Sequence, residues 1–170
     1  MGSGPAMMTL SPSEDARGFR DALGKFATGV TIVTTKTADG QKLGITANSF
    51  ASVSLDPPLV LWSPAKGSRR YPYFLEAEHF AIHVLSKAQR DIAAAFVREA
   101  NAFSGLDCDI NGAGVPLINN CLARFECTQS ATHDAGDHTV IIGRVTNCTV
   151  CEGEPIVFHS GTYGHFDPAN

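Results

Sequence analysis

Short apolar runs that alternate with polar positions dominate the chain, and this pattern predicts strands rather than long helices. A strand is expected from residue 43 onward, and others are expected over 30–35, 59–62, 80–85, 122–130, 139–150 and 156–159. A hairpin turn is predicted at 38–40, where the sequence reads Ala-Asp-Gly. The chain is therefore expected to be mainly β with a few helices. Strand spacing alone does not separate a barrel from a sandwich.

Helix signals are fewer. Residues 11–14 (SPSE) form a capping box with proline at the first helical position, followed by an apolar stripe at i, i+4 and i+7: Phe19, Leu23 and Phe26. This stripe predicts a helix that packs against the core. A short helix is expected over 71–76, and the capping box at 86–89 predicts another. The Gly/Asn/Asp-rich segment 101–120 predicts a long, mobile loop.

The length of 170 residues corresponds to one domain. We expect residues 11–170 to form it. Residues 1–10 are rich in Gly, Ser and Pro and contain a pair of methionines at 7 and 8, so they are interpreted as an expression-tag remnant or a disordered N-terminus.

Charge and composition exclude several classes of partner. Thirteen basic and 17 acidic residues give a net charge of -4 without any basic block, so neither nucleic acid nor an anionic membrane surface is an expected partner. The apolar runs are far shorter than the ~20 residues that cross a membrane. The N-terminus has no secretory signal pattern, and the five cysteines are irregularly spaced, which together predict a reducing cytoplasm.

The most informative segment is 44–61, GITANSFASVSLDPPLVL. A strand here runs into small hydroxyl and amide side chains, and an Asp-Pro-Pro corner and a second apolar strand follow. Small polar residues leave backbone N–H groups accessible and leave space for a planar ligand that carries a phosphate. The same alternation also fits the solvent face of an edge strand, so the pattern alone leaves both interpretations open.

The next turn, 63–68 (SPAKGS), is followed by two arginines. A lysine between serines in a Gly/Pro turn could bind a phosphate through charge-assisted hydrogen bonds and free loop amides. Taken alone, the turn fits an ordinary basic surface loop equally well.

Segment 44–61 closely resembles the signature of the short-chain flavin reductases, and the resemblance extends over about 19–166. It implies the FMN-binding split β-barrel fold, usually as a homodimer. The implied activity is NAD(P)H-dependent reduction of FMN or FAD, by hydride transfer from nicotinamide to flavin N5. Such reductases often serve a flavin-dependent monooxygenase, so the resemblance also implies that partner, reached by flavin diffusion.

The resemblance also implies roles for individual residues. In the family, the segment matching 46–49 lies along the flavin ring, and the hydroxyl matching Ser52 helps hold the phosphate. Residues of the following turn commonly contact the same phosphate. The implied cofactor-binding residues are therefore Thr46, Ala47, Asn48, Ser49, Ser52, Ser63, Lys66 and Ser68.

Two further residues follow from the resemblance. The Gly-Asp-His sequence at 136–138 is similar to a family motif whose histidine lies near both rings, which implies that His138 is the catalytic residue and also contacts the cofactor. The tail 158–166 resembles the family ending and places Tyr163 beside the flavin. Without the resemblance, a lone histidine starting a strand and a tyrosine at a barrel mouth are ordinary structural residues.

Two nucleotide-binding motifs are absent from the sequence. There is no G-x-G-x-x-G after a strand and no P-loop, so a nicotinamide must dock on another surface, which in the flavin reductases is the flavin itself. No metal site is expected, because His79 and His83 lie ~13 Å apart on one strand face. Cys148 and Cys151 lie on opposite faces of a continuous strand, and only a turn between them would permit a redox or zinc site.

Several alternatives stay open at this level. The flavin could be FMN or FAD, and the donor NADH or NADPH. A split-barrel flavin carrier or sensor without reductase turnover is the main alternative function, and a plain β-barrel interaction module is a third. For the reductase, we also predict that loop 101–120 lies near the mouth of the site as a flap.

Overall fold

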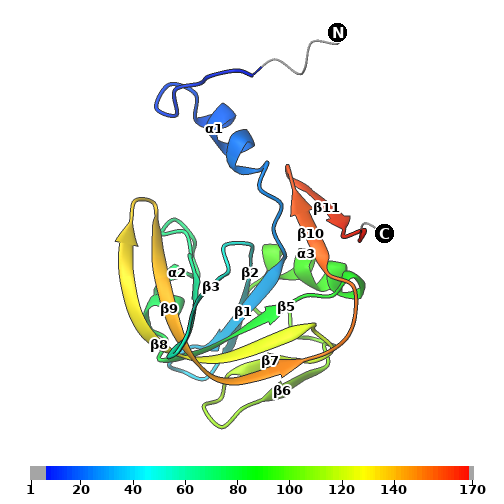
Figure 1. Ribbon diagram of the computed structural model, residues 1–170. Helices are drawn as coiled ribbons and strands as arrows, with labels where there is room; N and C mark the ends of the chain where they lie inside the picture. The colour runs from blue at the N-terminus through cyan, green and yellow to red at the C-terminus, as the bar shows by residue number, and fades with distance from the viewer. Residues whose placement is uncertain (1–6, 169–170) are drawn as a thin grey trace.

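The structure, a computed structural model, describes residues 7–168, and its body is one curved antiparallel sheet of seven strands (Figure 1). The strands run in the order β2-β1-β5-β8-β9-β4-β3. Their bounds are β1 Thr31–Lys36, β2 Lys42–Ala47, β3 Ala51–Leu55, β4 Pro58–Trp62, β5 His79–Val84, β8 Ala123–Ala135 and β9 His138–Val150. The prediction of a mainly β fold with a few helices is confirmed.

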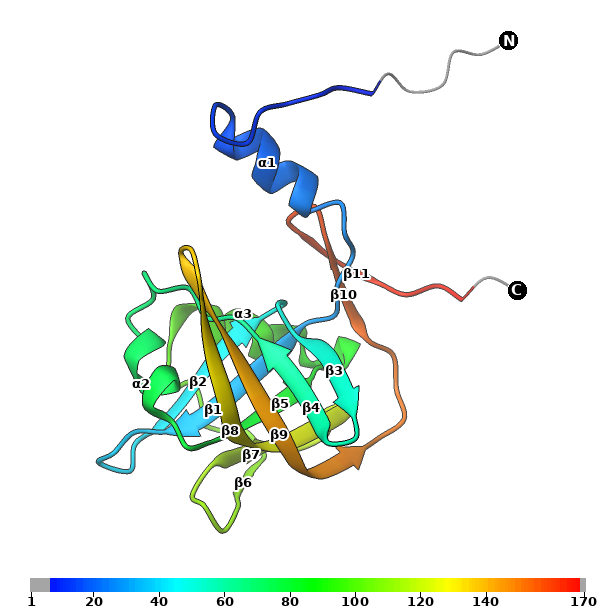
Figure 2. The same ribbon diagram turned by 60° about the vertical axis from the view of Figure 1, so that its left-hand side comes forward.

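The two edge strands of the sheet follow one another in the sequence. Residues 48–50 alone join β2 to β3, so the curled sheet brings its edges close together at this end (Figure 2). No ladder pairs β2 with β3 within residues 7–168, and the sheet stays open between them. We call this opening at 48–50 the seam. An open, curled sheet of this kind agrees with the expected split barrel.

Two apolar clusters lie on opposite faces of the central strands, because β1 and β5 are buried on both sides. The first cluster fills the inside of the curled sheet and includes Val33, Ile82 and Trp62, whose ring meets that of Phe74 edge-on at 5.0 Å between centroids. The second cluster, which includes Ile32, lies between the sheet and the elements packed outside it. The central strands of the sheet therefore lie between two apolar cores.

Three α-helices and one 3-10 helix surround the sheet: α1 Ala16–Leu23, α2 Tyr71–Glu76, η1 Lys87–Gln89 and α3 Arg90–Arg98. The capping box at 86–89 is confirmed. The predicted cap at 11–14 is wrong, because Asp15 caps α1 by accepting the Gly18 N–H at 2.7 Å.

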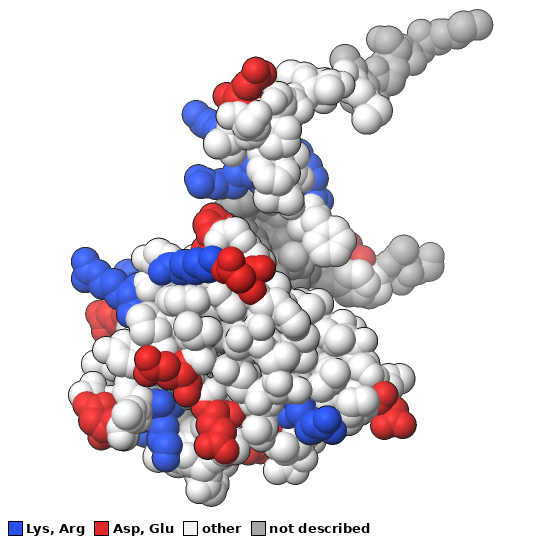
Figure 3. Space-filling view, turned by 90° about the vertical axis from the view of Figure 1, so that its left-hand side faces the viewer, with Lys and Arg blue, Asp and Glu red and all other residues white. Residues whose placement is uncertain are grey.

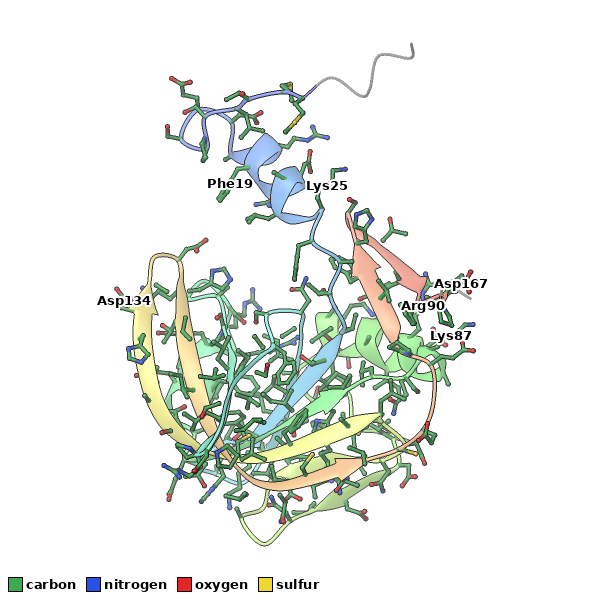
Figure 4. The ribbon with its side chains drawn as sticks, viewed as in Figure 1. Phe19, Lys25, Lys87, Arg90, Asp134 and Asp167 are labelled. Carbon is green, nitrogen blue, oxygen red and sulfur yellow. The ribbon has the colours of Figure 1, made fainter. Side chains whose placement is uncertain are left out.

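Helix α1 stands away from the sheet (Figures 1 and 4), and none of its residues is buried. The exposed fractions of the predicted apolar stripe are 43% for Phe19 and 61% for Leu23 in the helix, and 79% for Phe26, which follows it. The prediction that this stripe packs against the core is therefore wrong. Helix α1 is amphipathic as expected, but no other part of residues 7–168 buries its apolar side.

Two hairpins complete the fold: β6 Cys108–Ile110 with β7 Pro116–Ile118, and β10 Ile156–His159 with β11 Thr162–His165. The first hairpin corrects the prediction of a mobile loop over 101–120. Strand β7 packs on β1 and β5, and the ring of Phe103 packs on that of Phe96 at 4.9 Å. Gly, Asn and Asp in this segment form the turns of a hairpin rather than a flap.

No helix among the described residues is long and apolar enough to cross a membrane. In the same part of the chain, no three His, Cys, Asp or Glu side chains are grouped so that they could hold a metal ion. All five cysteines are free, with Cys148 and Cys151 exposed. Figure 3 shows acidic and basic side chains interspersed over one face of the molecule.

Candidate functional site

The end of β2, next to the seam, forms one wall of a hollow of about 160 Å³, which we call the seam hollow. The wall consists of Thr46, Ala47 and Asn48, at the end of β2. Helix α3 contributes Val97, and the C-terminal hairpin contributes Phe158 and Tyr163. Segments from the start, middle and end of the chain therefore meet at the residues expected to lie along a flavin ring.

Hydrogen bonds within the chain fix the backbone of this wall. The Thr46 hydroxyl donates to the Ala93 carbonyl of α3 at 2.7 Å, and the Thr31 hydroxyl donates to the Ala47 carbonyl at 2.7 Å. Gly44 lets α3 approach, because a Cβ there would lie 2.5 Å from the ring of Phe96. Since the Thr46 hydroxyl already has a partner, the wall presents a ligand with backbone groups and small side chains.

A larger hollow of about 610 Å³ continues from the seam toward α1 and shares Asn48 and Phe158 with the first. Thr28 lines it, and the Thr28 hydroxyl is buried without a hydrogen-bond partner among the described residues. A buried hydroxyl without a partner costs free energy unless a ligand or water supplies one. The two hollows together fit a polar-edged planar group.

The serines expected at the flavin have different surroundings. The Ser49 hydroxyl accepts the Ser63 N–H at 2.9 Å and donates to the Ser63 carbonyl at 3.2 Å. This pair ties the seam to the end of β4. Ser52 is exposed on the edge strand β3. Ser68 accepts the Arg70 N–H at 3.2 Å within the turn that follows β4.

Lys66 lies against the tip of the β8–β9 hairpin. Its ammonium group pairs with Asp134, which Figure 4 places at that tip, and donates to the Gly136 carbonyl at 2.6 Å. The Lys66 N–H donates to the Asp137 carbonyl at 2.9 Å. Turn 63–68 and the hairpin tip are therefore one unit, and a phosphate at Lys66 would compete with Asp134.

His138 begins β9 in the same unit and bridges to Ala65 across the ladder. Its Nδ1 lies 2.8 Å from Oδ1 of Asp137, and 43% of its side chain is exposed. The hydrogen bond from His138 holds the pKa of Asp137 below its usual value. The Asp137 carboxylate therefore orients the ring, whose Nε2 edge is free to meet a ligand.

Tyr163 lies where the resemblance places it, in the wall of the seam hollow. Its ring packs on Phe158 at 5.3 Å between centroids, and the Arg90 guanidinium lies 5.5 Å from the ring centre. The aromatic pair lies within the C-terminal hairpin, and the contact with Arg90 joins this hairpin to α3 beside the hollow.

The structure thus collects most of the expected residues in two neighbouring groups, connected by the bond between Ser49 and Ser63, and leaves Ser52 outside both. Thr46, Ala47, Asn48 and Tyr163 line the seam hollow, whereas Ser63, Lys66 and His138 belong to the hairpin-tip unit. Sequence reasoning missed Thr28, Val97 and Phe158. No local pattern marks them, because each reaches the seam only through the tertiary fold.

A comparison with protein families identifies this architecture. The model of the flavin reductase like domain matches residues 23–167. The chain belongs to this family. The predicted recognition is confirmed.

Proteins with similar sequences are named as flavin reductases or as reductase components of monooxygenases. The FMN reductase (NADH) SmoA of Agrobacterium fabrum is 58% identical over 153 residues, which are 90% of this chain and 87% of that protein. The reductase component of the flavin-dependent trigonelline monooxygenase of Acinetobacter baylyi is 46% identical over 96% of this chain. This chain spans only 52% of that protein's length.

Solved structures support the same fold. The NADH:FAD oxidoreductase SgcE6 of Streptomyces globisporus superposes with a TM-score of 0.90 at 33% identity, covering 99% of this chain and 96% of that one. The flavin reductase PheA2 superposes with a TM-score of 0.82 at 36% identity, covering 91% of this chain and 99% of that one. The predicted fold is confirmed by these similarities.

Proposed function

We propose that the protein reduces FMN or FAD with NADH or NADPH, by direct hydride transfer from nicotinamide C4 to flavin N5. The observation that carries the proposal is the seam hollow, where the wall 46–48 meets Tyr163 in a chain of this family. The relatives SmoA and SgcE6, named for NADH and for FMN or FAD, support the same pair of reactants.

In this proposal a bound flavin supplies the hydride-accepting atom, and the chain binds and orients. The backbone of Thr46, Ala47 and Asn48 lies along the flavin ring, with Tyr163 beside it. Ser52, Ser63, Lys66 and Ser68 form the phosphate side. The Asp137 carboxylate holds the ring of His138, which orients the nicotinamide or donates a proton near the flavin.

The product of such a reaction is reduced flavin, which a second protein must use. The reductase component of trigonelline monooxygenase and the reductase subunit HsaB of Mycobacterium tuberculosis, 37% identical over 94% of this chain, are named as parts of monooxygenases. We therefore propose a flavin-dependent monooxygenase as partner, served by diffusion of reduced flavin. The five free cysteines support the proposed location, a reducing cytoplasm.

A homodimer is also part of the proposal. The apolar stripe of α1 is exposed, and this helix stands away from its own sheet (Figure 1). Burying large apolar side chains against a second copy would stabilise the assembly by about 1.5–3 kcal/mol each. The large hollow beside α1 would then lie at the boundary between the two copies.

Anaerobic mixing tests the proposed activity. Purified protein with FMN or FAD is mixed with excess NADH and, separately, NADPH, and the long-wavelength absorption band of the flavin is followed. We expect this band to bleach with at least one donor, much faster than in the absence of protein. Flavin that binds but stays oxidised with both donors would replace the reductase by the carrier or sensor function.

A further inference from the structure

A third hollow, of about 420 Å³, adjoins the seam hollow at Thr46 and Val97. Three arginines and a serine line it: Arg69, Arg70, Arg98 and Ser68. No acidic side chain belongs to its lining. We call it the arginine hollow. In a chain with a net charge of -4, this is a concentrated positive site.

The charges of the arginine hollow are not neutralised within residues 7–168. No Asp or Glu there forms a salt bridge with any of the three guanidinium groups. Like charges that share a small space without a counter-ion repel one another, and an anion relieves that repulsion. The hollow therefore favours an anionic occupant.

Arg70 gives this hollow a rigid wall. Its guanidinium donates to the carbonyls of Phe96 and, at 3.3 Å each, of Gly44 and Val97. These bonds close the last turn of α3, so a purely structural role accounts for Arg70. The same role does not account for Arg69 and Arg98, which are exposed and flank the hollow.

The location of the hollow suggests what kind of anion it binds. Ile45 and Thr46 of β2 line the arginine hollow, and Thr46 is shared with the seam hollow. The proposed function places the flavin and nicotinamide rings in the seam hollow. Both FAD and NAD(P)H have an adenosine half, joined to the ring half through two phosphates. Guanidinium groups bind phosphate oxygens through paired, charge-assisted hydrogen bonds.

We propose that the arginine hollow binds the adenosine-side phosphates of a dinucleotide whose ring half occupies the seam hollow. The proposal rests on the proposed function and adds to it a separate subsite for the adenosine half. Ser68, which the proposed function places at the flavin phosphate, also lines this hollow, so the two neighbouring phosphates of a dinucleotide would meet at Ser68. FAD and NAD(P)H share this chemistry, whereas FMN and riboflavin lack it.

The test uses a double variant, Arg69→Gln with Arg98→Gln, and Arg144→Gln as the matched control. Arg144 is exposed on β9 and does not line the arginine hollow. Dissociation constants for FAD and FMN are measured by fluorescence titration, and the KM for NADH is measured with saturating FMN. Loss of charge-assisted hydrogen bonds should raise at least one dinucleotide constant by roughly tenfold or more. FMN affinity should change by less than about threefold, and the control should behave like the unaltered protein.

The two sources of phosphate give different results. A weaker FAD affinity with unchanged KM for NADH assigns the hollow to the flavin dinucleotide, and the reverse result assigns it to the nicotinamide dinucleotide. Unchanged values for both overturn the proposal. Equal losses for FMN and FAD also overturn it, because the hollow would then hold the phosphate next to the flavin ring. If the unaltered protein oxidises no NADH, the proposed function fails, while the comparison of FAD with FMN still tests the hollow.

Discussion

Two contacts with carboxylates set the surroundings of Lys66 and His138 at the hairpin tip. Lys66 meets Asp134, and His138 meets Asp137. The Asp134 side chain is 81% exposed, whereas that of Lys66 is 34% exposed. Exposed pairs contribute at most about 1 kcal/mol, so a phosphate can displace Asp134 at low cost. Lys66 is thus held in place for an anion, and the competing carboxylate of Asp134 lies largely in solvent.

The first prediction concerns this lysine. Lys66→Ala should weaken FMN binding by ~1.5–3 kcal/mol, the range for a hydrogen bond to a charged group, and should leave riboflavin binding nearly unchanged. Flavin fluorescence titration measures both. Asp134→Asn is the matched control, because it frees Lys66 and should leave FMN affinity equal or higher. Equal losses of FMN and riboflavin would mean that Lys66 acts only by fixing the hairpin tip.

His138 carries the second prediction. Its ring is oriented by Asp137 and lies apart from the wall 46–48, so it should serve the nicotinamide more than the flavin. His138→Ala should raise the KM for NAD(P)H or slow flavin reduction, with flavin affinity within about threefold. Asp137→Asn should give a weaker effect of the same kind. Stopped-flow reduction kinetics that do not change in His138→Ala would leave this histidine a structural residue.

At the scale of elements, the β6–β7 hairpin depends on one buried histidine. Nε2 of His83 accepts the Ile118 N–H at 3.0 Å, so Nδ1 carries the proton and donates to the Ile32 carbonyl at 3.0 Å. Burial, reinforced by the nearby charge of Arg124, lowers the pKa of His83 to about 4. The neutral ring therefore connects β5 to β7 and to β1.

The third prediction follows from the sign of this pKa shift. The unfolded chain takes up the His83 proton near pH 6.5 and the folded chain only near pH 4, so stability is lost as the pH falls through this range. The loss from His83 should approach about 3 kcal/mol, at about 1.4 kcal/mol per pH unit. Urea unfolding at several pH values measures it.

A substitution isolates this contribution. His83→Gln should be less stable than the unaltered protein at pH 7 but should lose less stability on acidification. His133→Gln, at an exposed histidine of β8, should follow the unaltered protein. Parallel pH profiles for His83→Gln and His133→Gln would show that His83 does not cause the acid loss.

At the scale of the whole molecule, helix α1 buries none of its residues, although the segment that follows it is hydrogen-bonded to the C-terminal hairpin at Gly24 and Thr28. Figure 4 shows Phe19 on α1, clear of the sheet, and the chain crosses from α1 to β1 through an extended segment (Figures 1 and 2). An exposed apolar stripe on a protruding helix is typical of a contact with another chain. A second copy is the occupant that the family resemblance favours.

The fourth prediction tests that contact. Sedimentation velocity at micromolar concentration should give a dimer, and Leu23→Asp with Phe26→Asp should give a monomer, because a buried charge cannot replace these side chains. Val150→Asp is the control, since Val150 is 75% exposed at the end of β9. It should remain a dimer. A monomeric unaltered protein at this concentration would remove the dimer from the proposal.

The sequence alone predicted a large part of the fold. Alternation gave the strands of the sheet, since a period of two is a local property of the chain, and the capping box at 86–89 gave the start of the segment leading into α3. It also singled out segment 44–61, because small polar residues there leave space and backbone groups for a ligand. The structure adds a separate reason for Gly44, where a Cβ would meet the ring of Phe96.

The tertiary structure decided what depends on distant contacts. Whether the stripe of α1 meets its own core, whether 101–120 forms a hairpin, and which residues join 46–48 in one hollow all depend on surfaces that lie far apart in the chain. Phe158 and Val97 reach the seam, and Arg69 and Arg98 share a hollow, only because β2 lies between α3, the C-terminal hairpin and the turn after β4. The local sequence pattern does not predict which distant residues lie together, because tertiary packing determines those contacts.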